Sequence, residues 1–309
     1  MYDVIIIGAG FAGYTAAIYS VRYNMKTLII AKQPGGAIIN SSKVENWPGF
    51  TSIPGFELMQ KFEAQAREFG AEIVLDEALG IVRKDSVFKV ETKQGKEYEA
   101  KAIILALGTE RRKLEVPGAD KFEGKGVHYC ATCDAAFYKN KTVAVIGGSN
   151  SAAHAALLLA RFAKKVYIIY RKEALRCEPA MHCTIKETKH AETIYSTNVV
   201  EVKGKQFVEK IVLDKAYNGK KELALDGLFV EIGSVPSSAI AKELGVELDK
   251  NNNIIVDANG TTNIKGVFAA GDVTNTVLRQ GVTAAAQGAI AATSAYQLIT
   301  GKDPRVAWS

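Results

Sequence analysis

Two of the four cysteines lie close together, in Cys130-Ala131-Thr132-Cys133, and Asp134 follows directly. This spacing is compatible with a redox disulfide, half of a zinc site or two ordinary thiols. A four-cysteine zinc site needs a second close pair about 15–20 residues away, whereas the next cysteines, Cys177 and Cys183, are more distant and differently spaced. Thiol–disulfide exchange needs an attacking thiolate, a resolving thiol and a nearby proton donor. Cys130, Cys133 and Asp134 supply all three, so we predict a redox pair and no metal site.

A glycine-rich turn near the N-terminus has the form of a dinucleotide-binding site. Gly8-Ala9-Gly10-Phe11-Ala12-Gly13 follows an apolar run and precedes a helical pattern. In this context Gly8 permits the tight turn, Gly10 admits a pyrophosphate and Gly13 lets helix and strand pack closely. The acid expected about 20 residues later, on a ribose, is replaced by Ala31-Lys32. We predict dinucleotide binding in preference to a plain glycine turn, with ribose contacts supplied from elsewhere.

A second turn of the same kind begins at Gly147-Gly148-Ser149 and reaches Ala152 at the position where the helix packs. Ser149 occupies the place where the backbone normally approaches phosphate most closely. Its side chain either donates a hydrogen bond to the phosphate or obstructs it, and the sequence leaves both readings open.

A cluster of cations follows the next strand, at Arg171, Lys172 and Arg176. Cations at this strand end, in place of an acid, suit the 2′-phosphate of NADP. The alternative is a solvated basic loop, because a charge cluster alone is a weak signal. We expect NADPH at the second turn.

Near the C-terminal end of the chain, the apolar run Val267 to Ala270 leads into Gly271-Asp272. A carboxylate at the carboxyl end of a parallel strand accepts hydrogen bonds from sugar hydroxyls. Capping of a following helix is the structural alternative for Asp272, and both roles are compatible.

The elements that must position these residues form a repeated strand–turn–helix–strand unit. The two copies are expected at 2–31 and 141–172, with continuous Val and Ile runs typical of parallel strands buried on both faces. Further expected elements are helices at 57–69 and 282–299 and strands at 103–107, 193–213, 227–232 and 267–270. The repeat predicts an α/β chain with two dinucleotide-binding domains of the Rossmann type.

Composition agrees with two globular domains and excludes several other classes. The chain has 309 residues, 48% hydrophobic and 23% charged, with a net charge of +6, and about 150 residues make one domain. The apolar runs fall short of the roughly 18 residues of a membrane span. The basic residues are scattered, which argues against nucleic-acid binding. The first residues, Met1 to Ile7, lack the pattern of a secretion signal, so we expect a cytoplasmic protein.

Taken together, the chain resembles the low-molecular-weight, bacterial-type thioredoxin reductases, which are FAD-dependent members of the disulfide reductase superfamily. The matching segments span the chain in order: Gly8 to Gly13, Val44-Glu45-Asn46-Trp47-Pro48-Gly49, Cys130 to Asp134, Arg171-Lys172 with Arg176, Gly271-Asp272-Val273 and Arg279-Gln280.

The resemblance implies an FAD domain formed by residues 1–112 and 242–309. A second, NADPH-binding domain that carries the cysteine pair, at 113–241, is inserted between these segments. It also implies a homodimer. Rotation of the inserted domain is expected on connections near 111–118 and 233–245, because the disulfide must meet both the flavin and a bulky protein.

The resemblance further assigns roles to individual residues. Cys133 is the thiol next to the flavin, Cys130 attacks a disulfide of a thioredoxin-like protein, and Asp134 exchanges protons. Asn46, Asp272 and Gln280 are FAD contacts in the same comparison, and Gly271 and Arg279 belong to the same matching segments.

Several residues depart from the family pattern, and most of them fall in the expected NADPH site. In that site the family commonly has Gly at the position of Ser149, His at Tyr170, Arg at Lys172 and Glu at His154. Near the flavin it commonly has Gln at the position of Ala37. One alternative is therefore a subgroup that takes electrons from ferredoxin. A ferredoxin–NADP reductase-like flavoprotein, which would need no cysteine pair, and a non-enzymatic flavin module are the others.

Overall fold

The computed structural model describes residues 1–41 and 44–303, and it divides the chain into two compact units. The first unit contains Met1–Glu110 and the chain from Val235 onward, and the second contains Arg111–Ser234. The second boundary lies earlier than the expected one at 241/242. The physical reason is helix α6, Ala239–Glu243, whose residue Ala241 is fully buried in the core of the first unit.

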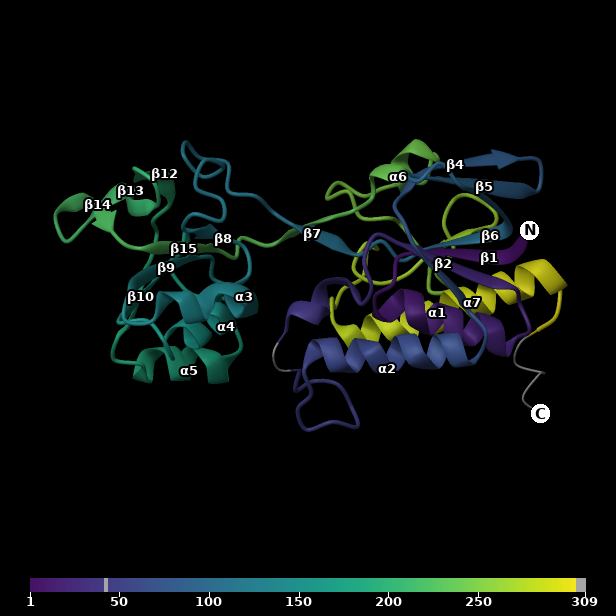
Figure 1. The fold of residues 1–309 in the computed structure, drawn as a ribbon, viewed down its shortest axis with the longest axis horizontal. Helices are drawn as coiled ribbons and strands as arrows, with labels where there is room; N and C mark the ends of the chain where they lie inside the picture. The colour runs from purple at the N-terminus through teal and green to yellow at the C-terminus, as the bar shows by residue number, and fades with distance from the viewer. Residues whose placement is uncertain (42–43, 304–309) are drawn as a thin grey trace. The chain divides into compact units, whose positions relative to one another are not determined.

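The first unit is built on one mixed sheet with the strand order β3-β2-β1-β6-β5-β4, and β17 also pairs with β6 (Figure 1). The strands are β1 Tyr2–Ile7, β2 Thr27–Ala31, β3 Glu72–Leu75, β4 Ala78–Lys84, β5 Val87–Thr92, β6 Glu97–Leu105 and β17 Val267–Ala269. Strands β1, β2, β3, β6 and β17 are parallel, whereas β4 and β5 form an antiparallel extension.

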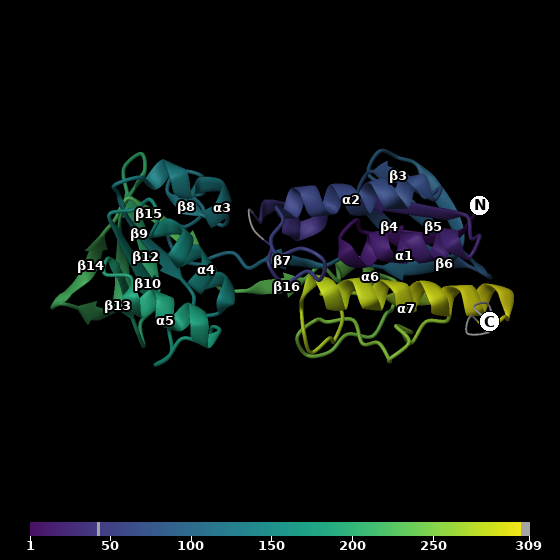
Figure 2. The same ribbon diagram turned by 90° about the horizontal axis from the view of Figure 1, so that it is seen from below.

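Helices α1 Phe11–Arg22, α2 Gly55–Glu68 and α7 Gly281–Thr300 lie side by side on one face of this sheet (Figure 2). Ile6 and Ile29 point into the core beneath these helices, and their neighbours Ile5 and Leu28 point into the core on the opposite face. Burial on both faces explains why these strands are continuously apolar instead of alternating. A short 3-10 helix, η1 Gly36–Asn40, follows β2.

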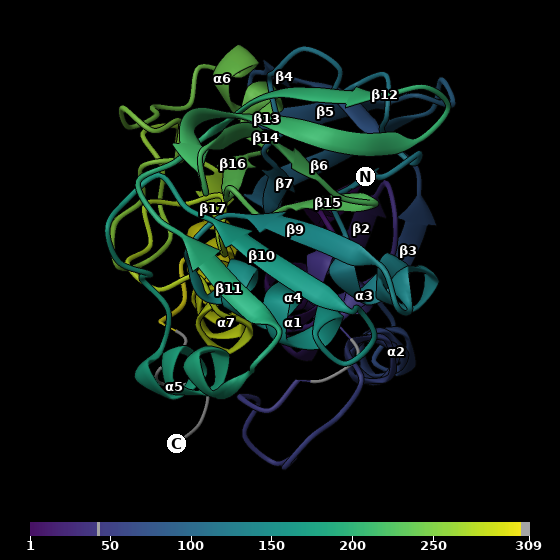
Figure 3. The same ribbon diagram turned by 90° about the vertical axis from the view of Figure 1, so that its left-hand side faces the viewer.

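The second unit has a parallel sheet in the order β11-β10-β9-β15-β8 (Figure 3). Its strands are β8 Val127–His128, β9 Thr142–Ile146, β10 Lys165–Ile169, β11 Ala191–Ile194 and β15 Gly227–Val230. Helices α3 Ala131–Asp134, α4 Asn150–Leu159 and α5 Pro179–Glu187 lie on one side, with the 3-10 helix η2 Ala135–Tyr138. An antiparallel sheet of β12 Val199–Gly204, β13 Val208–Tyr217 and β14 Lys220–Ala224 covers the other.

The two connections pair with each other as short strands, β7 Thr109–Arg111 and β16 Ser234–Pro236. The expected fold class, an α/β chain with Rossmann-like sheets, is confirmed, and the predicted βαβ units correspond to β1-α1-β2 and β9-α4-β10. Within residues 1–41 and 44–303, no helix combines the length and the apolar character that crossing a bilayer requires.

Candidate active site

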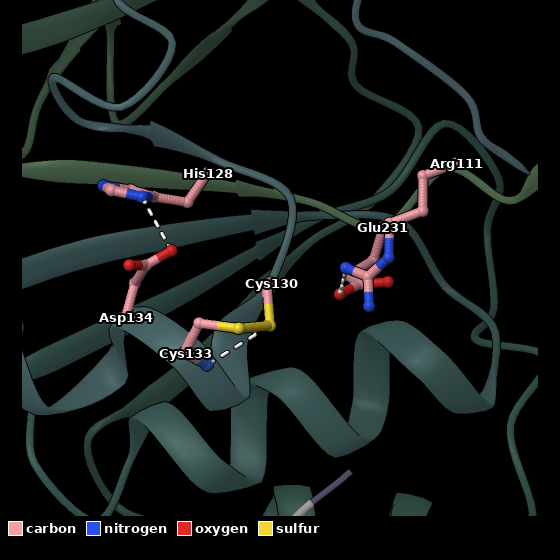
Figure 4. Close-up of a disulfide and its surroundings, with 6 residues drawn as sticks. All are labelled: Arg111, His128, Cys130, Cys133, Asp134 and Glu231. Carbon is pink, nitrogen blue, oxygen red and sulfur yellow. Dashed lines mark hydrogen bonds and ion pairs between the residues drawn. A yellow bond between two sulfur atoms is a disulfide. The ribbon is translucent and has the colours of Figure 1, made fainter. Parts of the chain in front are cut away.

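Cys130 and Cys133 form a disulfide in the second unit, with their Cα atoms 5.4 Å apart (Figure 4). Cys130 directly precedes α3, and the backbone N–H of Cys133 donates a hydrogen bond to its Sγ at 3.2 Å. Cys130 is half-buried and Cys133 is exposed. An N–H aimed at a sulfur stabilises negative charge there, so the geometry favours a thiolate on Cys130 after reduction.

His128, two residues before Cys130, connects two residues that the sequence analysis did not link. Its Nδ1 lies 2.9 Å from Asp134 Oδ2, and its Nε2 lies 2.6 Å from the Tyr138 hydroxyl (Figure 4 draws His128 and Asp134). The imidazole stacks on Phe229 of β15, with ring centres 5.2 Å apart. Burial, and next the charges of Asp134 and Asp226, raise the pKa of Tyr138 to about 12. Asp134 is therefore hydrogen-bonded within a half-buried network.

The second glycine-rich turn borders a cavity of about 460 Å³ within the same unit. Gly147 has φ +140°, and a Cβ there would lie 2.2 Å from the Glu231 carbonyl oxygen. A Cβ on Gly148 would lie 2.5 Å from the Tyr170 ring. Ala152 is buried in α4 beneath Gly147, as its small size predicts. The turn is therefore fixed by close packing and leaves its cavity side open.

Three arginines line this cavity, namely Arg112, Arg171 and Arg176. Arg176 is held against the turn because its backbone N–H donates to the Gly148 carbonyl at 2.6 Å. Lys172 was also expected here, but it is not among the cavity-lining residues in the described part of the chain. Its backbone carbonyl accepts a hydrogen bond from the Ser196 N–H. The sequence analysis missed Arg112, which lies far from the motif along the chain.

Ser149 lines the cavity at the start of α4, where it is the N-cap residue and makes no capping hydrogen bond through its side chain. Its hydroxyl therefore remains available to a ligand. The neighbouring Asn150 exchanges two hydrogen bonds with Glu178, at 2.8 and 3.0 Å. These bonds join the loop that carries Arg176 to the first turn of α4, and the cavity wall is therefore held together from both sides.

One acidic side chain also lines the cavity. Glu231 follows β15 directly, and its side chain is only 13% exposed. Burial raises the pKa of Glu231, while the Arg111 guanidinium, 3.4 Å away, opposes that rise (Figure 4). No sequence motif pointed to this ion pair, because the two residues are 120 positions apart.

The first glycine-rich turn, in the other unit, shows a comparable cradle. Gly8 has φ +113°, and a Cβ there would lie 2.1 Å from the Ala106 carbonyl oxygen. A Cβ on Gly13 would lie 1.9 Å from the carbonyl oxygen of Gly8, whereas a Cβ on Gly10 would meet nothing within 4 Å. Gly8 and Gly13 are thus required by packing, and Gly10 leaves open space at the N-terminus of α1, where a pyrophosphate fits.

Two expected flavin contacts meet in the same unit. The Asn46 side-chain amide donates to Gln280 Oε1 at 2.9 Å, although the residues are 234 positions apart. Trp47, next to Asn46, stacks on Phe11 of α1 with ring centres 4.9 Å apart. Gly281 accommodates that ring, because a Cβ there would lie 2.6 Å from Phe11. Packing of the aromatic rings therefore brings Asn46 and Gln280 together.

The capping role considered for Asp272 is wrong. Helix α7 begins at Gly281, and its N-cap is Gln280, which forms a capping box with Thr283. Asp272 lies further upstream, where burial raises its pKa and the charge of Arg279 opposes the rise. A half-buried carboxylate at the end of β17 retains the hydrogen-bonding capacity that a sugar hydroxyl requires.

Partners of the surrounding residues come from distant parts of the chain. The N–H of Gly271 donates to Gln287 Oε1 at 2.8 Å, and Arg279 donates to Asn253 Oδ1 at 2.5 Å. The sequence analysis singled out neither Gln287 nor Asn253. In the described part of the chain, no group of three or more His, Cys, Asp or Glu side chains is arranged to hold a metal ion.

Comparison with known proteins places this geometry in a family. The sequence matches the pyridine nucleotide-disulphide oxidoreductase family over residues 2–288, and the chain belongs to that family. More specifically, it is 40% identical over 301 residues to a thioredoxin reductase of Treponema pallidum, covering 96% of this chain and 97% of that protein.

Solved structures agree with this placement. The Lactococcus lactis thioredoxin reductase superposes with a TM-score of 0.93 at 37% identity, covering 98% of this chain and all of the other. The T. acidophilum thioredoxin reductase superposes with a TM-score of 0.89 at 36% identity, covering 96% of this chain and 98% of that chain. The resemblance stated from the motifs is confirmed: the chain is an oxidoreductase of the thioredoxin reductase type, a type that uses FAD and NADPH.

Proposed function

We propose that this protein passes electrons from NADPH, through FAD and the Cys130–Cys133 disulfide, to the disulfide of a thioredoxin-like protein. The observation that carries the proposal is the presence of the disulfide and a glycine- and arginine-lined cavity in one unit. A second dinucleotide cradle, around Gly8 to Gly13, belongs to the other unit.

In this proposal the first unit holds FAD and the second holds NADPH. The residues assigned to FAD are Gly8, Gly10, Gly13, Asn46, Gly271, Asp272, Arg279 and Gln280. Those assigned to NADPH are Gly147, Gly148, Ser149, Arg171 and Arg176, with Ala152 as packing support and Arg112 as an addition from the structure. FAD supplies the two-electron chemistry that reduces the disulfide.

The remaining chemistry belongs to the chain itself. After reduction, the Cys130 thiolate attacks one sulfur of the partner disulfide, whose S–S bond breaks, and the departing thiolate takes a proton from Asp134. The Cys133 thiol then returns a proton to Asp134 and attacks the Cys130 sulfur, which restores the disulfide and releases the second partner sulfur as a thiolate that takes its proton from solvent. Two electrons leave the enzyme in each cycle. The hydrogen bond from the Cys133 N–H to Cys130 Sγ supports Cys130 as the attacking sulfur.

The proposal extends to assembly and location. A homodimer and a cytoplasmic location follow from the resemblance, and a reducing compartment suits an enzyme that keeps protein thiols reduced. Rotation of the second unit about its connections remains a prediction. Ferredoxin is the alternative electron donor, because Ser149 and Lys172 depart from the family pattern at the expected nucleotide site.

The test is anaerobic mixing of the FAD-loaded protein with NADPH, followed by addition of oxidised thioredoxin. We expect the flavin absorbance to bleach and thioredoxin to be reduced catalytically, while Cys133→Ser keeps FAD but loses turnover. Cys183→Ser is the matched control, since Cys183 is a free, exposed thiol, and it should retain full activity. Bleaching by reduced ferredoxin and not by NADPH would replace the proposed donor. Full turnover of Cys133→Ser would reject the mechanism.

A further inference from the structure

The network of His128, Asp134 and Tyr138 gives the histidine a role that the cysteine motif alone does not contain. Its two ring nitrogens are both engaged, at 2.9 Å by Asp134 and at 2.6 Å by Tyr138. The three side chains come from β8, α3 and η2, and Phe229 of β15 stacks against the imidazole. The side chain of His128 is 11% exposed and that of Asp134 is 27% exposed. The imidazole is therefore fixed on its edges and on one face.

The direction of the hydrogen bonds follows from the chemistry of Asp134 and Tyr138. Burial raises the pKa of Tyr138 to about 12, so its hydroxyl stays protonated at neutral pH. A neutral imidazole has one donor and one acceptor nitrogen. An ionised Asp134 carboxylate only accepts, so a neutral ring carries its hydrogen on Nδ1 and donates it to Asp134 Oδ2, while Nε2 accepts from the Tyr138 hydroxyl. The Asp134 carboxylate selects this tautomer, the Tyr138 hydroxyl supports it, and the Nδ1–H bond orients the carboxylate.

We propose that His128 is a positioning residue for thiol–disulfide exchange, which holds the Asp134 carboxylate by an Nδ1–H hydrogen bond in the orientation that serves the Cys130–Cys133 pair. This inference rests on the proposed function only in assigning proton exchange to Asp134. The bond engages Oδ2 and restrains rotation of the carboxylate. The arrangement follows the logic by which a fixed partner orients a catalytic acid or base.

The charged and titratable groups around the imidazole are few in the described ranges. Asp134 faces it from α3 and Tyr138 from η2, while β15 contributes the uncharged Phe229. Around Tyr138, Asp226 acts through its charge, and the Lys141 ammonium lies 5.4 Å from the ring centre. Asp134 is therefore the acidic group to which His128 itself is bonded.

The experiment follows exchange alone, so it needs neither thioredoxin nor NADPH. The FAD-loaded protein is reduced anaerobically with dithionite, and its dithiol is then reoxidised by one of two small disulfides. Bis(2-hydroxyethyl) disulfide releases a basic thiolate that needs a proton, whereas DTNB releases a weakly basic aromatic thiolate that leaves without one. The ratio of the two rates isolates proton delivery from the access and nucleophilicity of the sulfur.

Two substitutions at His128 separate positioning from packing. His128→Phe keeps a planar ring against Phe229 but removes both hydrogen bonds, and we expect the hydroxyethyl disulfide reaction to slow about 10-fold. This is less than the roughly 10²–10⁴-fold that acid–base catalysis supplies, because Asp134 itself remains. The DTNB reaction should change less than about 2-fold, since it needs no proton. His128→Asn places an amide N–H near the position of Nδ1, so it should recover most of the lost rate.

Tyr138→Phe and His182→Gln complete the set of variants. Tyr138→Phe removes the hydroxyl that supports this tautomer and should give a smaller loss of the same kind. His182→Gln, on α5, should leave both rates unchanged.

The positioning role is overturned if His128→Phe leaves the ratio of the two reoxidation rates unchanged, either because neither rate falls or because both fall in parallel. So does a His128→Asn variant as slow as His128→Phe. These outcomes are distinct from a failure of the proposed function, in which the wild-type protein would exchange with small disulfides but not with thioredoxin.

Discussion

Nucleotide preference offers the sharpest test of the second cavity. Arg171 and Arg176 line the cavity. The hydrogen bond from the Arg176 backbone N–H to the Gly148 carbonyl holds Arg176 beside the glycine turn. We expect the double substitution Arg171→Ala with Arg176→Ala to abolish the preference for a 2′-phosphorylated nucleotide. Lys172→Ala is the matched control, because Lys172 follows Arg171 directly but lies outside the described lining residues.

The magnitude follows from the contacts that a phosphate would gain. A hydrogen bond to a charged group contributes about 1.5–3 kcal/mol, and both side chains are exposed, so the lower value applies after solvent screening. Two such contacts amount to about 3 kcal/mol, or roughly 100-fold in affinity. Affinity for NAD⁺ should change little, because it carries no 2′-phosphate.

The assay is calorimetric titration of the oxidised, FAD-loaded protein with NADP⁺ and NAD⁺, so that no flavin chemistry interferes. In the wild-type protein the NADP⁺ affinity should fall with added salt, as charged contacts are screened. Equal losses for both nucleotides in the double variant would show that the arginines shape the cavity without reading the phosphate. An effect of Lys172→Ala as large as that of the double variant would also refute this assignment.

Two further predictions concern the packing of the two sites. Gly8→Ala should destabilise the first unit by at least about 1–3 kcal/mol and lower its FAD content, because the new Cβ would meet the Ala106 carbonyl oxygen at 2.1 Å with φ at +113°. Thermal melting measures the loss of stability and flavin absorbance measures the FAD content. The control Gly80→Ala, whose Cβ would meet nothing within 4 Å, should match the wild type. Arg111→Ala should destabilise the second unit by about 1 kcal/mol at pH 8, the upper end for ion pairs with an exposed partner, since the Arg111 side chain is 45% exposed. The loss should be much smaller near pH 4, because the substitution raises the already elevated folded-state pKa of Glu231, and an acid with a raised folded-state pKa costs stability only at pH values where its unfolded form is ionised. Urea melts at the two pH values provide the measurement, with Arg161→Ala as control, and a loss independent of pH would contradict the electrostatic reasoning.

The local sequence determined the repeated βαβ units, the two glycine-rich turns and the cysteine pair. These features depend on residues near one another in the chain: apolar runs buried on both faces form parallel strands, and a glycine at φ +113° or +140° is required by its own turn. The redox assignment of Cys130 and Cys133 likewise needed only their spacing and the neighbouring acid.

Tertiary structure decided which distant side chains complete each site. Asn46 meets Gln280 only because Trp47 stacks on Phe11, and Glu231 reaches the cavity only because β15 inserts beside β9. His128 likewise acquires its support from β15, whose Phe229 pairs with it in register. No local pattern encodes such contacts, since strand order and register are set by packing of the whole unit. The same cause placed Lys172 outside the cavity lining, brought Arg112 into it and moved the second boundary to Ser234.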